Sequence, residues 1–422
     1  MVTVLPFHGL RYAPELVAAS LFAPPYDVID PRQRLAHLAG NPNNIVHIDL
    51  GPDQDPAWYA EAARIRDRWL AERVLLREPQ PALYGYQQHF AVGDKPYVRT
   101  GLLGTVRLAE WGRGIHPHER TRVGPRQDRL NLMRALRAQS SPVFGMYRDP
   151  SDEIGRWLTP PAQPDVDVTD AEGVRHLFWP ITDGAALGAL TAALARRDVV
   201  IADGHHRYET ALAYRAERRA AEGNPGEQRP YDAVLMYLTS AESDGLRILA
   251  AHRVVHAPIA DPQALLNALR ADFDLLALES AAHLSAAVTQ TAPGEIAFGL
   301  CLGRAGAWLL KLRDRAAAQR HAGGLPAEIA TLDVVALQDM ILAPHLGISA
   351  QALAHDDSVS YTVNAEEACE SVHAGRAQAA FILNPTRIDQ VWHAALKGVT
   401  MPQKSTYFWP KLLTGLVLNP LD

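Results

Sequence analysis

The stretch from Val199 to Thr210 constrains the fold of this chain more than any other, because its character changes abruptly at Gly204. Residues 199–202 are apolar and precede an aspartate, a pattern typical of a buried strand. From Tyr208 onward, apolar residues recur at helical spacing and lead into a charged run at residues 215–222. The stretch therefore predicts a strand, a tight turn at Gly204 and a helix.

The residues of this turn suit an anion. The first amides of a helix have no partner within the helix and carry the positive end of its dipole, so together with Arg207 they predict a cradle for a phosphate. Asp203, His205 and His206 add proton-transfer and metal-binding capacity. The alternative is that Asp203 is an ordinary helix cap and that the histidines are solvated loop residues.

Length and composition limit the class of protein. A chain of 422 residues is too long for one ordinary core and predicts two or three structural units. Its 48% hydrophobic and 21% charged residues indicate a soluble globular protein, and a net charge of -6 gives no electrostatic case for duplex nucleic acid as a partner. No apolar stretch is long enough to span a bilayer and the N-terminus lacks a signal pattern, so we expect no membrane partner and a cytoplasmic location.

The two cysteines, Cys301 and Cys369, lie far apart in sequence in apolar or helical contexts. They fit small buried hydrophobic residues in a reducing compartment, with neither a disulfide nor a zinc framework.

Hydrophobic periodicity predicts mixed α and β structure along the whole chain, with a boundary near residue 256. The expected helices are 32–39, 58–73, 126–134, 185–196, 333–342 and 389–397, and the expected strands are 45–50, 83–90, 98–108, 143–147, 231–238, 247–255, 295–300, 308–312 and 379–383.

Two loops in the first half of the chain carry candidate functional residues. Two prolines in residues 23–29 stiffen the backbone and project Tyr26 and Asp27, either as a binding edge or as a plain surface turn. Glu119 follows His118 in a region rich in arginine, and nearby positive charge would hold its carboxylate ionised, the state that a general base needs. The alternative for Glu119 is a solvated loop carboxylate.

A third candidate loop, residues 401–411, combines two lysines, two hydroxyls and three adjacent aromatic residues. Lysine and hydroxyl groups suit phosphate or carboxylate recognition, and the aromatic rings could stack on a base or close a pocket. The alternative is a strand near the C-terminus whose aromatic rings lie in the core.

Four of these stretches together resemble the SerK-like family, known as the domain of unknown function 1015 family: residues 23–29, His118-Glu119, residues 203–210 and residues 402–406. The resemblance covers nearly the whole chain. It implies an α+β fold with a ParB/sulfiredoxin-like nucleotide-binding core and an N-terminal extension in residues 1–256. It also implies a second α/β unit in residues 257–422, whose loop 401–411 returns to the active site.

The resemblance further implies a nucleotide-dependent phosphotransferase that acts on a small hydroxyl metabolite, with conversion of free L-serine to O-phosphoserine as the leading reaction. The donor would be ATP or ADP, with Mg²⁺ at Asp203. The catalytic residues would be Glu119, Asp203 and His205, the phosphate-binding residues Gly204, His205, His206 and Arg207, and the substrate-binding residues Lys404, Ser405, Thr406, His118, Tyr26 and Asp27. Thr406 is followed by Tyr407 and Phe408, where the archaeal kinases have an Arg-His pair.

Two other functions stay open at this point. One is a nucleotide-binding regulatory protein without catalysis. The other is a metal-dependent hydrolase with Asp203, His205, His206 and Glu209 as ligands. The sequence contains neither a Walker A motif nor the protein-kinase signatures, and it leaves the donor nucleotide, the acceptor and the oligomeric state open, a homodimer included.

Overall fold

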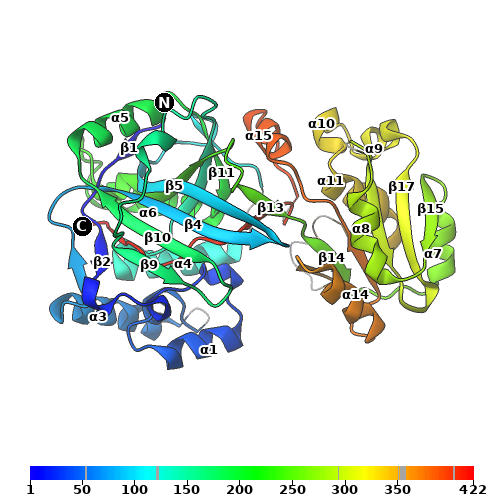
Figure 1. The fold of residues 1–422 in the computed structure, drawn as a ribbon, viewed down its shortest axis with the longest axis horizontal. Coiled ribbons are helices and arrows are strands. Elements are labelled where there is room, and N and C mark those ends of the chain that lie inside the picture. The colour runs from blue at the N-terminus through cyan, green and yellow to red at the C-terminus, as the bar shows by residue number, and fades with distance from the viewer. Residues whose placement is uncertain (53–54, 120–122, 293, 350, 352–357, 403) are drawn as a thin grey trace. The chain divides into compact units, whose positions relative to one another are not determined.

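Two β-sheets, one in each of two structural units, organise the fold (Figure 1). The computed structural model describes residues 1–422 apart from 53–54, 120–122, 293, 350, 352–357 and 403. Unit 1 consists of Met1–Pro117, Thr121–Arg247 and Pro410–Asp422, and unit 2 consists of His118–Arg120 and Ile248–Trp409. The prediction of a boundary at residues 256 and 257 stays a prediction.

In the described part of unit 1, the main sheet has nine strands in the order β6-β11-β8-β12-β5-β4-β10-β9, with β1 paired to β5. The strands are β1 Val4–Leu5, β4 Leu83–Val92, β5 Lys95–Arg107, β6 Ile115–His116, β8 Val143–Tyr147, β9 Val166–Thr169, β10 Arg175–Ile181, β11 Val199–Asp203 and β12 Ala233–Ser240. Short pairs join β2 Leu10–Tyr12 to β3 Leu75–Arg77, and β7 Ala138–Gln139 to β21 Asn419–Pro420. Most pairs are antiparallel, while β6 with β11 and β8 with β12 are parallel.

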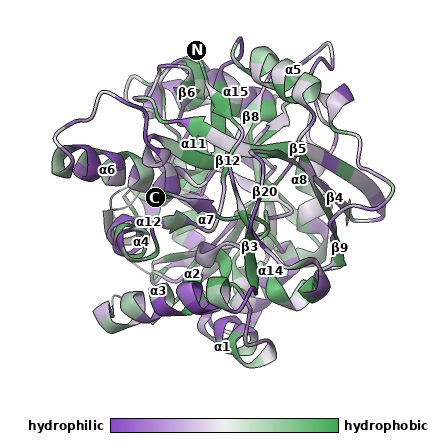
Figure 2. Cartoon of the chain, turned by 90° about the vertical axis from the view of Figure 1, so that its left-hand side faces the viewer, coloured by the Kyte–Doolittle hydropathy of each residue, from purple (hydrophilic) through white to green (hydrophobic). Residues whose placement is uncertain are grey.

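The helices of unit 1 are α1 Pro31–Gly40, α2 Val46–Asp49, α3 Pro56–Ala71, α4 Val123–Leu136, α5 Gly184–Leu194 and α6 His205–Ala221. Asp30, Asp55 and Asp183 cap α1, α3 and α5 with their side chains. Helix α3 carries both hydrophobic and hydrophilic residues along its length, while strand β12 is largely hydrophobic (Figure 2). The sheet and its helices therefore enclose a core that includes Leu190, Val199 and Tyr208.

In the described part of unit 2, a six-stranded sheet has the order β15-β17-β16-β19-β14-β18. Its strands are β14 His252–Val255, β15 Phe273–Leu278, β16 Ala297–Cys301, β17 Ala307–Leu312, β18 Val359–Thr362 and β19 Ala379–Ile382, and β13 Arg247–Leu249 pairs with β20 Tyr407–Trp409. The helices are α7 Pro262–Leu269, α8 Leu284–Thr289, α9 Arg315–His321, α10 Ala327–Ala330, α11 Asp333–Leu337, α12 Ala343–Leu346, α14 Ala365–His373 and α15 Ile388–Leu396, with a π-helical turn at Gln338–Leu342.

The structure confirms the mixed α and β class and the predicted strand, turn and helix around Gly204. The finer prediction of a ParB/sulfiredoxin-like core stays a prediction. The strand predicted at residues 45–50 is wrong, because Val46–Asp49 forms helix α2. The Asn44 side chain accepts a hydrogen bond from the Val46 N–H at 2.9 Å, and Ile45, Val46 and Ile48 are all buried, so their apolar pattern belongs to a buried helical turn.

Cys301 and Cys369 are both free and buried, as predicted. Although they lie far apart in sequence, Cys301 at the end of β16 and Cys369 in α14 belong to the same hydrophobic cluster, and Sγ of Cys301 lies 3.8 Å from Nε2 of His373. No helix in the described ranges is both long and apolar enough to cross a membrane.

Candidate functional site

The turn after β11 is built around a left-handed glycine. Gly204 has φ 87° and ψ 30°, a conformation that residues with a side chain adopt only at an energetic cost. A Cβ atom at this position would lie 2.8 to 2.9 Å from the guanidinium of Arg207. The left-handed backbone conformation therefore favours glycine, a side chain here would also make the Arg207 guanidinium shift, and α6 begins directly after the glycine.

Two positively charged side chains, Lys411 and Arg207, lie close to Asp203, the last residue of β11. The Lys411 ammonium lies 2.8 Å from Oδ2 of Asp203, and Nη2 of Arg207 lies 3.7 Å from Oδ1. The backbone N–H of Gly204 donates to Oδ1 at 2.7 Å. Because two cations face one carboxylate and the helix dipole adds positive potential, the turn keeps an excess of positive charge that favours an anion.

A third cation, Arg99 of β5, is completely buried. It donates from Nε to Oε1 of Gln88 at 3.1 Å and from Nη2 to the carbonyl oxygen of Pro410 at 2.5 Å. Burial lowers the pKa of Arg99, while neighbouring tyrosines and the Asp203 carboxylate oppose that shift. Since an arginine stays protonated in proteins, Arg99 adds a fixed charge to the electrostatic environment of Asp203.

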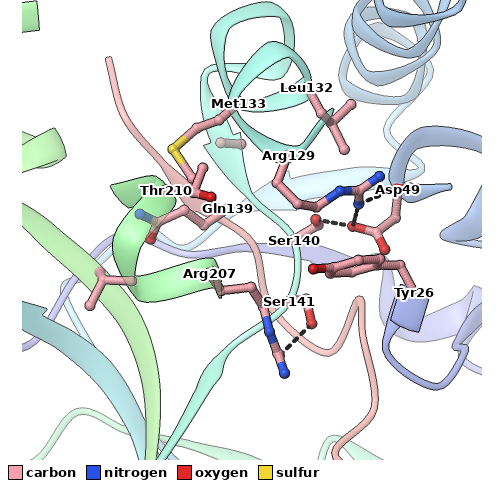
Figure 3. Close-up of a pocket in the computed structure, with 12 residues that line it drawn as sticks. Tyr26, Asp49, Arg129, Leu132, Met133, Gln139, Ser140, Ser141, Arg207 and Thr210 are labelled. Carbon is pink, nitrogen blue, oxygen red and sulfur yellow. Dashed lines mark hydrogen bonds and ion pairs between the residues drawn. The ribbon is translucent and has the colours of Figure 1, made fainter. Parts of the chain in front are cut away.

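Arg207 is anchored on its far side by the residues before β8. Its Nη1 donates to Oγ of Ser141 at 2.9 Å and to the carbonyl oxygen of Pro142. The side chain lines a cavity of about 40 Å³ (Figure 3). The cavity is bounded by Tyr26, Asp49, Arg129, Leu132, Met133, Ala138, Gln139, Ser140, Ser141, Arg207, Thr210 and Val234. This volume is close to that of one water molecule, and the Arg207 side chain forms part of the cavity wall.

The predicted loop 23–29 contributes to this same cavity. Tyr26 begins a short 3₁₀ helix, Tyr26–Val28, and its ring centre lies 4.2 Å from Cζ of Arg129. Burial raises the pKa of Tyr26 well above its usual range, and the charge of Asp27 adds to that rise. Asp27 itself is exposed. Tyr26 and Arg207 therefore line the same cavity, whereas Asp27 lies at the surface.

His205 and His206 form the first turn of α6. His205 is 8% exposed and His206 is half-buried, and Oγ1 of Thr210 donates to the carbonyl oxygen of His206 at 2.7 Å. In the part of the chain that the structure describes, no three His, Cys, Asp or Glu side chains gather in an arrangement that could hold a metal ion. The described residues therefore do not show the ligand set that a metal-dependent hydrolase would need.

In unit 2, the structure brings His118 and Glu119 to the predicted loop 401–411. Nε2 of His118 lies 2.9 Å from Oγ1 of Thr406, and the Lys404 backbone N–H donates to Oε1 of Glu119 at 3.1 Å. Ser405 is buried and donates from Oγ to the carbonyl oxygen of Pro402 at 2.6 Å. Gln403 lies outside the described residues.

Arg253 of β14 supplies the positive charge at Glu119. Its side chain is 3% exposed, and its Cζ lies 5.1 Å from the ring centre of Tyr361. Burial lowers the pKa of Arg253, and Tyr361 and Glu119 oppose that shift. The negative charge of Glu119 therefore interacts favourably with the buried guanidinium of Arg253.

Three cations at these sites were not among the predicted site residues. Within loop 401–411 the sequence pattern favours Lys404, whereas the structure places Lys411 on Asp203. Arg99 and Arg253 each lie in a stretch that was predicted to form a strand, and a charged residue next to the apolar positions of such a strand is the signal that could have identified them. The predicted residues of the turn, with Tyr26 and Asp27, belong to unit 1, and His118, Glu119 and residues 404–406 belong to unit 2.

Solved structures similar to this chain share little sequence with it. A conserved hypothetical protein from Pyrococcus furiosus is 14% identical, with 75% of this chain and 95% of that chain covered and a TM-score of 0.34. A free serine kinase in complex with AMP is also 14% identical, with 75% and 92% covered and a TM-score of 0.33. SbnI with a C-terminal truncation from Staphylococcus aureus is 12% identical, with 74% and 87% covered and a TM-score of 0.37. Values this low carry no activity over to the present chain.

A search of curated proteins found no match. The family model described as "Protein of unknown function (DUF1015)" matches residues 4–335, which include the turn and the His118-Glu119 pair and end before loop 401–411. Because this match spans most of the chain, the protein belongs to the DUF1015 family.

Proposed function

We propose that this protein is a nucleotide-dependent phosphotransferase whose turn at residues 203–207 binds the phosphates of the nucleotide. The observation that carries the proposal is the convergence of Lys411, Arg207 and the N-terminus of α6 on Asp203, with the buried charge of Arg99 nearby. Left-handed Gly204 keeps the backbone accessible to a close anion, because a side chain at that position would collide with Arg207.

Phosphoryl transfer suits such a site. The reaction needs an aligned nucleophile and charge neutralisation around the transferred group, and little covalent chemistry from the protein. Arg207 would offset the phosphate charge, Lys411 would neutralise Asp203, and Gly204 would permit the phosphate to approach closely. Mg²⁺ at Asp203 stays a prediction, because Lys411 pairs with Oδ2 of this carboxylate and the Gly204 N–H and Arg207 face Oδ1. Bound Mg²⁺ would supply further charge neutralisation.

The proposed acceptor is a small hydroxyl compound, with free L-serine as the first candidate. The support comes from the resemblance of residues 402–406 and His118-Glu119 to the serine kinases, and from the contacts of Glu119 and His118 with that loop. Tyr407 and Phe408 give this chain aromatic residues where those kinases have Arg and His, so a less polar hydroxyl compound is the second candidate. ATP or ADP as donor, a homodimer and a cytoplasmic location stay predictions.

Substitution of Arg207 tests the proposed phosphate site. A charge-assisted hydrogen bond contributes about 1.5–3 kcal/mol, so Arg207→Ala should weaken ADP binding by at least about tenfold. Arg218→Ala removes a charge from the other end of the same helix and serves as the matched control, with affinity expected to stay unchanged. Calorimetric titration measures both. Wild-type affinity in a folded Arg207→Ala protein would remove Arg207 from the phosphate site.

The acceptor is identified by incubating the protein with labelled ATP or ADP and a pool of small hydroxy metabolites, followed by mass spectrometry. A phosphorylated metabolite that depends on the protein confirms transferase activity. Nucleotide binding with no phosphorylated product would instead favour the regulatory alternative.

A further inference from the structure

The chain segment at residues 410–414 is fastened to unit 1 by buried polar groups. It crosses β4 and β5 and reaches the loop that contains Tyr26. The contacts are Arg99 Nη2 to the Pro410 carbonyl at 2.5 Å, Gln88 Nε2 to the Lys411 carbonyl at 2.9 Å, the Leu413 N–H to Tyr86 Oη at 3.3 Å and the Thr414 N–H to the Ala23 carbonyl at 2.8 Å. Arg99, Gln88 and Tyr86 are completely buried.

These buried groups extend away from the segment as well. Tyr86 Oη lies 2.7 Å from Nδ1 of His176, and Nε2 of His176 lies 3.0 Å from Oδ2 of Asp170. Burying so many polar groups costs free energy unless each finds a partner, so such a network is expected to hold a single geometry. In this structure the network fixes the position of the backbone at Pro410 and Lys411, whose carbonyl oxygens accept hydrogen bonds from Arg99 and Gln88.

The fixed backbone directs the Lys411 ammonium to Asp203. The two side chains are 13% and 22% exposed, and their charged atoms are 2.8 Å apart. Solvent and salt screen such a partly buried pair less than a surface pair. The same segment also approaches Arg207, because Oγ1 of Thr414 lies 3.2 Å from Oγ of Ser141, the acceptor of the Arg207 guanidinium.

The negative charge of Asp203 conflicts with the binding of an anion at the same turn. Its Oδ1 accepts the Gly204 N–H and faces Arg207, so the carboxylate orders the turn. The same negative charge would repel a phosphate bound beside it. A cation on Oδ2 removes this conflict, because it neutralises the carboxylate while Oδ1 continues to hold the turn.

We propose, on the basis of the function proposed above, that Lys411 is a positioning residue of the phosphate site. It neutralises Asp203, so that the carboxylate can order Gly204 and Arg207 without repelling the nucleotide. Lys411 therefore acts on the nucleotide through Asp203, and the buried contacts of Arg99, Gln88 and Tyr86 keep its ammonium in place.

A double-mutant cycle on ADP affinity, measured by calorimetry in EDTA so that no metal contributes, tests this role. Lys411→Met should weaken ADP binding by at least about tenfold, and Lys411→Arg should restore most of the affinity because it restores the charge. The Asp203→Asn background removes the negative charge and keeps a hydrogen-bond acceptor for the turn. In that background Lys411→Met should cost less than about threefold, because the two changes act on one interaction. Lys397→Met, which breaks the 2.6 Å pair with Glu328 in unit 2, is the matched control and should leave affinity unchanged.

Three outcomes overturn the proposal: an unchanged affinity in Lys411→Met, the same loss in the Asp203→Asn background as in wild type, or no recovery in Lys411→Arg. A second cycle on the free energy of unfolding, without nucleotide, measures the coupling between Lys411 and Asp203 directly. If the wild-type protein binds no ADP, the proposed function fails, whereas the absence of coupling in unfolding refutes the Lys411–Asp203 interaction itself.

Discussion

Glu119 combines a structural contact with a predicted chemical role. Its Oε1 accepts the backbone N–H of Lys404, a residue with φ 56°, and its charge offsets that of buried Arg253. A non-glycine residue in the left-handed region is strained, so the hydrogen bond to Glu119 helps to hold this part of loop 401–411. The Lys404 contact thus fixes the position of the carboxylate that is predicted to act as the general base.

We expect Glu119→Gln to separate these two roles. The amide oxygen can still accept the Lys404 N–H, but the side chain can no longer take a proton. Acceptor phosphorylation should fall by about 10²–10⁴-fold, the usual contribution of a general base. ADP affinity should change by less than about threefold.

Steady-state kinetics with the identified acceptor measures this effect. Thermal unfolding measures how much stability the protein loses when Arg253 no longer has the charge of Glu119 nearby. Glu119→Ala, which also loses the Lys404 contact, is the comparison for loop disorder. If a folded Glu119→Gln protein kept the full kcat, Glu119 would not be the general base, and its role would be limited to the hydrogen bond with Lys404.

At the scale of elements, β14 depends on a histidine that must stay neutral. His252 begins the strand, is 5% exposed, and accepts the Leu383 N–H on Nδ1 at 3.2 Å just after β19. Burial, with a contribution from the charge of Arg253, lowers the pKa of His252 from 6.5 to about 4. Protonation of Nδ1 would turn the acceptor into a donor facing another donor, and would place a charge in the core.

The sign of the pH dependence follows from this shift. Between the unfolded pKa of 6.5 and the folded pKa of about 4, the unfolded chain binds the proton more strongly. The stability that His252 contributes is therefore complete above pH 6.5 and is lost as the pH falls towards about 4, by about 3 kcal/mol in all.

His252→Asn keeps an acceptor near the Nδ1 position and does not titrate. We expect its free energy of unfolding to fall less steeply than that of wild type over this pH range, as measured by denaturant unfolding at a series of pH values. If the free energy of unfolding of the two proteins changed in parallel with pH, the pKa of His252 would be the same in the folded and the unfolded state, and the prediction would be wrong. His345→Asn, a substitution at an exposed histidine in unit 2, is the control and should leave the curve unchanged.

At the scale of the whole molecule, unit 1 is assembled from segments at both ends of the chain. Residues 410–422 belong to it although residues 248–409 fold as part of unit 2. The Leu418 N–H donates to the Leu10 carbonyl and the Leu10 N–H donates to the Leu418 carbonyl, each at 2.9 Å, and β21 pairs with β7. Six apolar side chains of the segment are buried, namely Leu412, Leu413, Leu416, Val417, Leu418 and Leu421.

Deletion of residues 410–422 should therefore unfold unit 1. At roughly 1.5 kcal/mol for each buried side chain, the six contribute about 9 kcal/mol, which is comparable with the entire stability of a typical domain. Limited proteolysis should cut residues 1–117 rapidly in the deleted protein, and removal of exposed Asp422 alone should leave them protected. Protection of residues 1–117 after the full deletion would contradict this account of the core.

Local sequence determined the elements whose pattern is complete within a short window. The apolar run 199–202, Gly204 and the helical spacing after Tyr208 were enough to predict β11, the turn and α6, because strand and helix periods differ and the left-handed turn requires glycine. Residues 45–50 were predicted wrongly for a related reason. A short buried apolar run satisfies both periods, and the hydrogen bond from the Val46 N–H to the Asn44 side chain favours a helical turn.

The partners of the turn were decided only by the tertiary structure. Lys411 lies 208 positions from Asp203, and Glu119 lies 285 positions from Lys404. No local pattern encodes such pairs. The Lys411–Asp203 pair depends on the position of residues 410–414, where Gln88 of β4 and Arg99 of β5 donate hydrogen bonds to the backbone. The local sequence was thus sufficient to predict the strand, the turn and the helix, and the anion site at this turn stays a prediction. The tertiary structure decided which cation neutralises Asp203, because that choice depends on where buried Gln88, Arg99 and Tyr86 hold the chain.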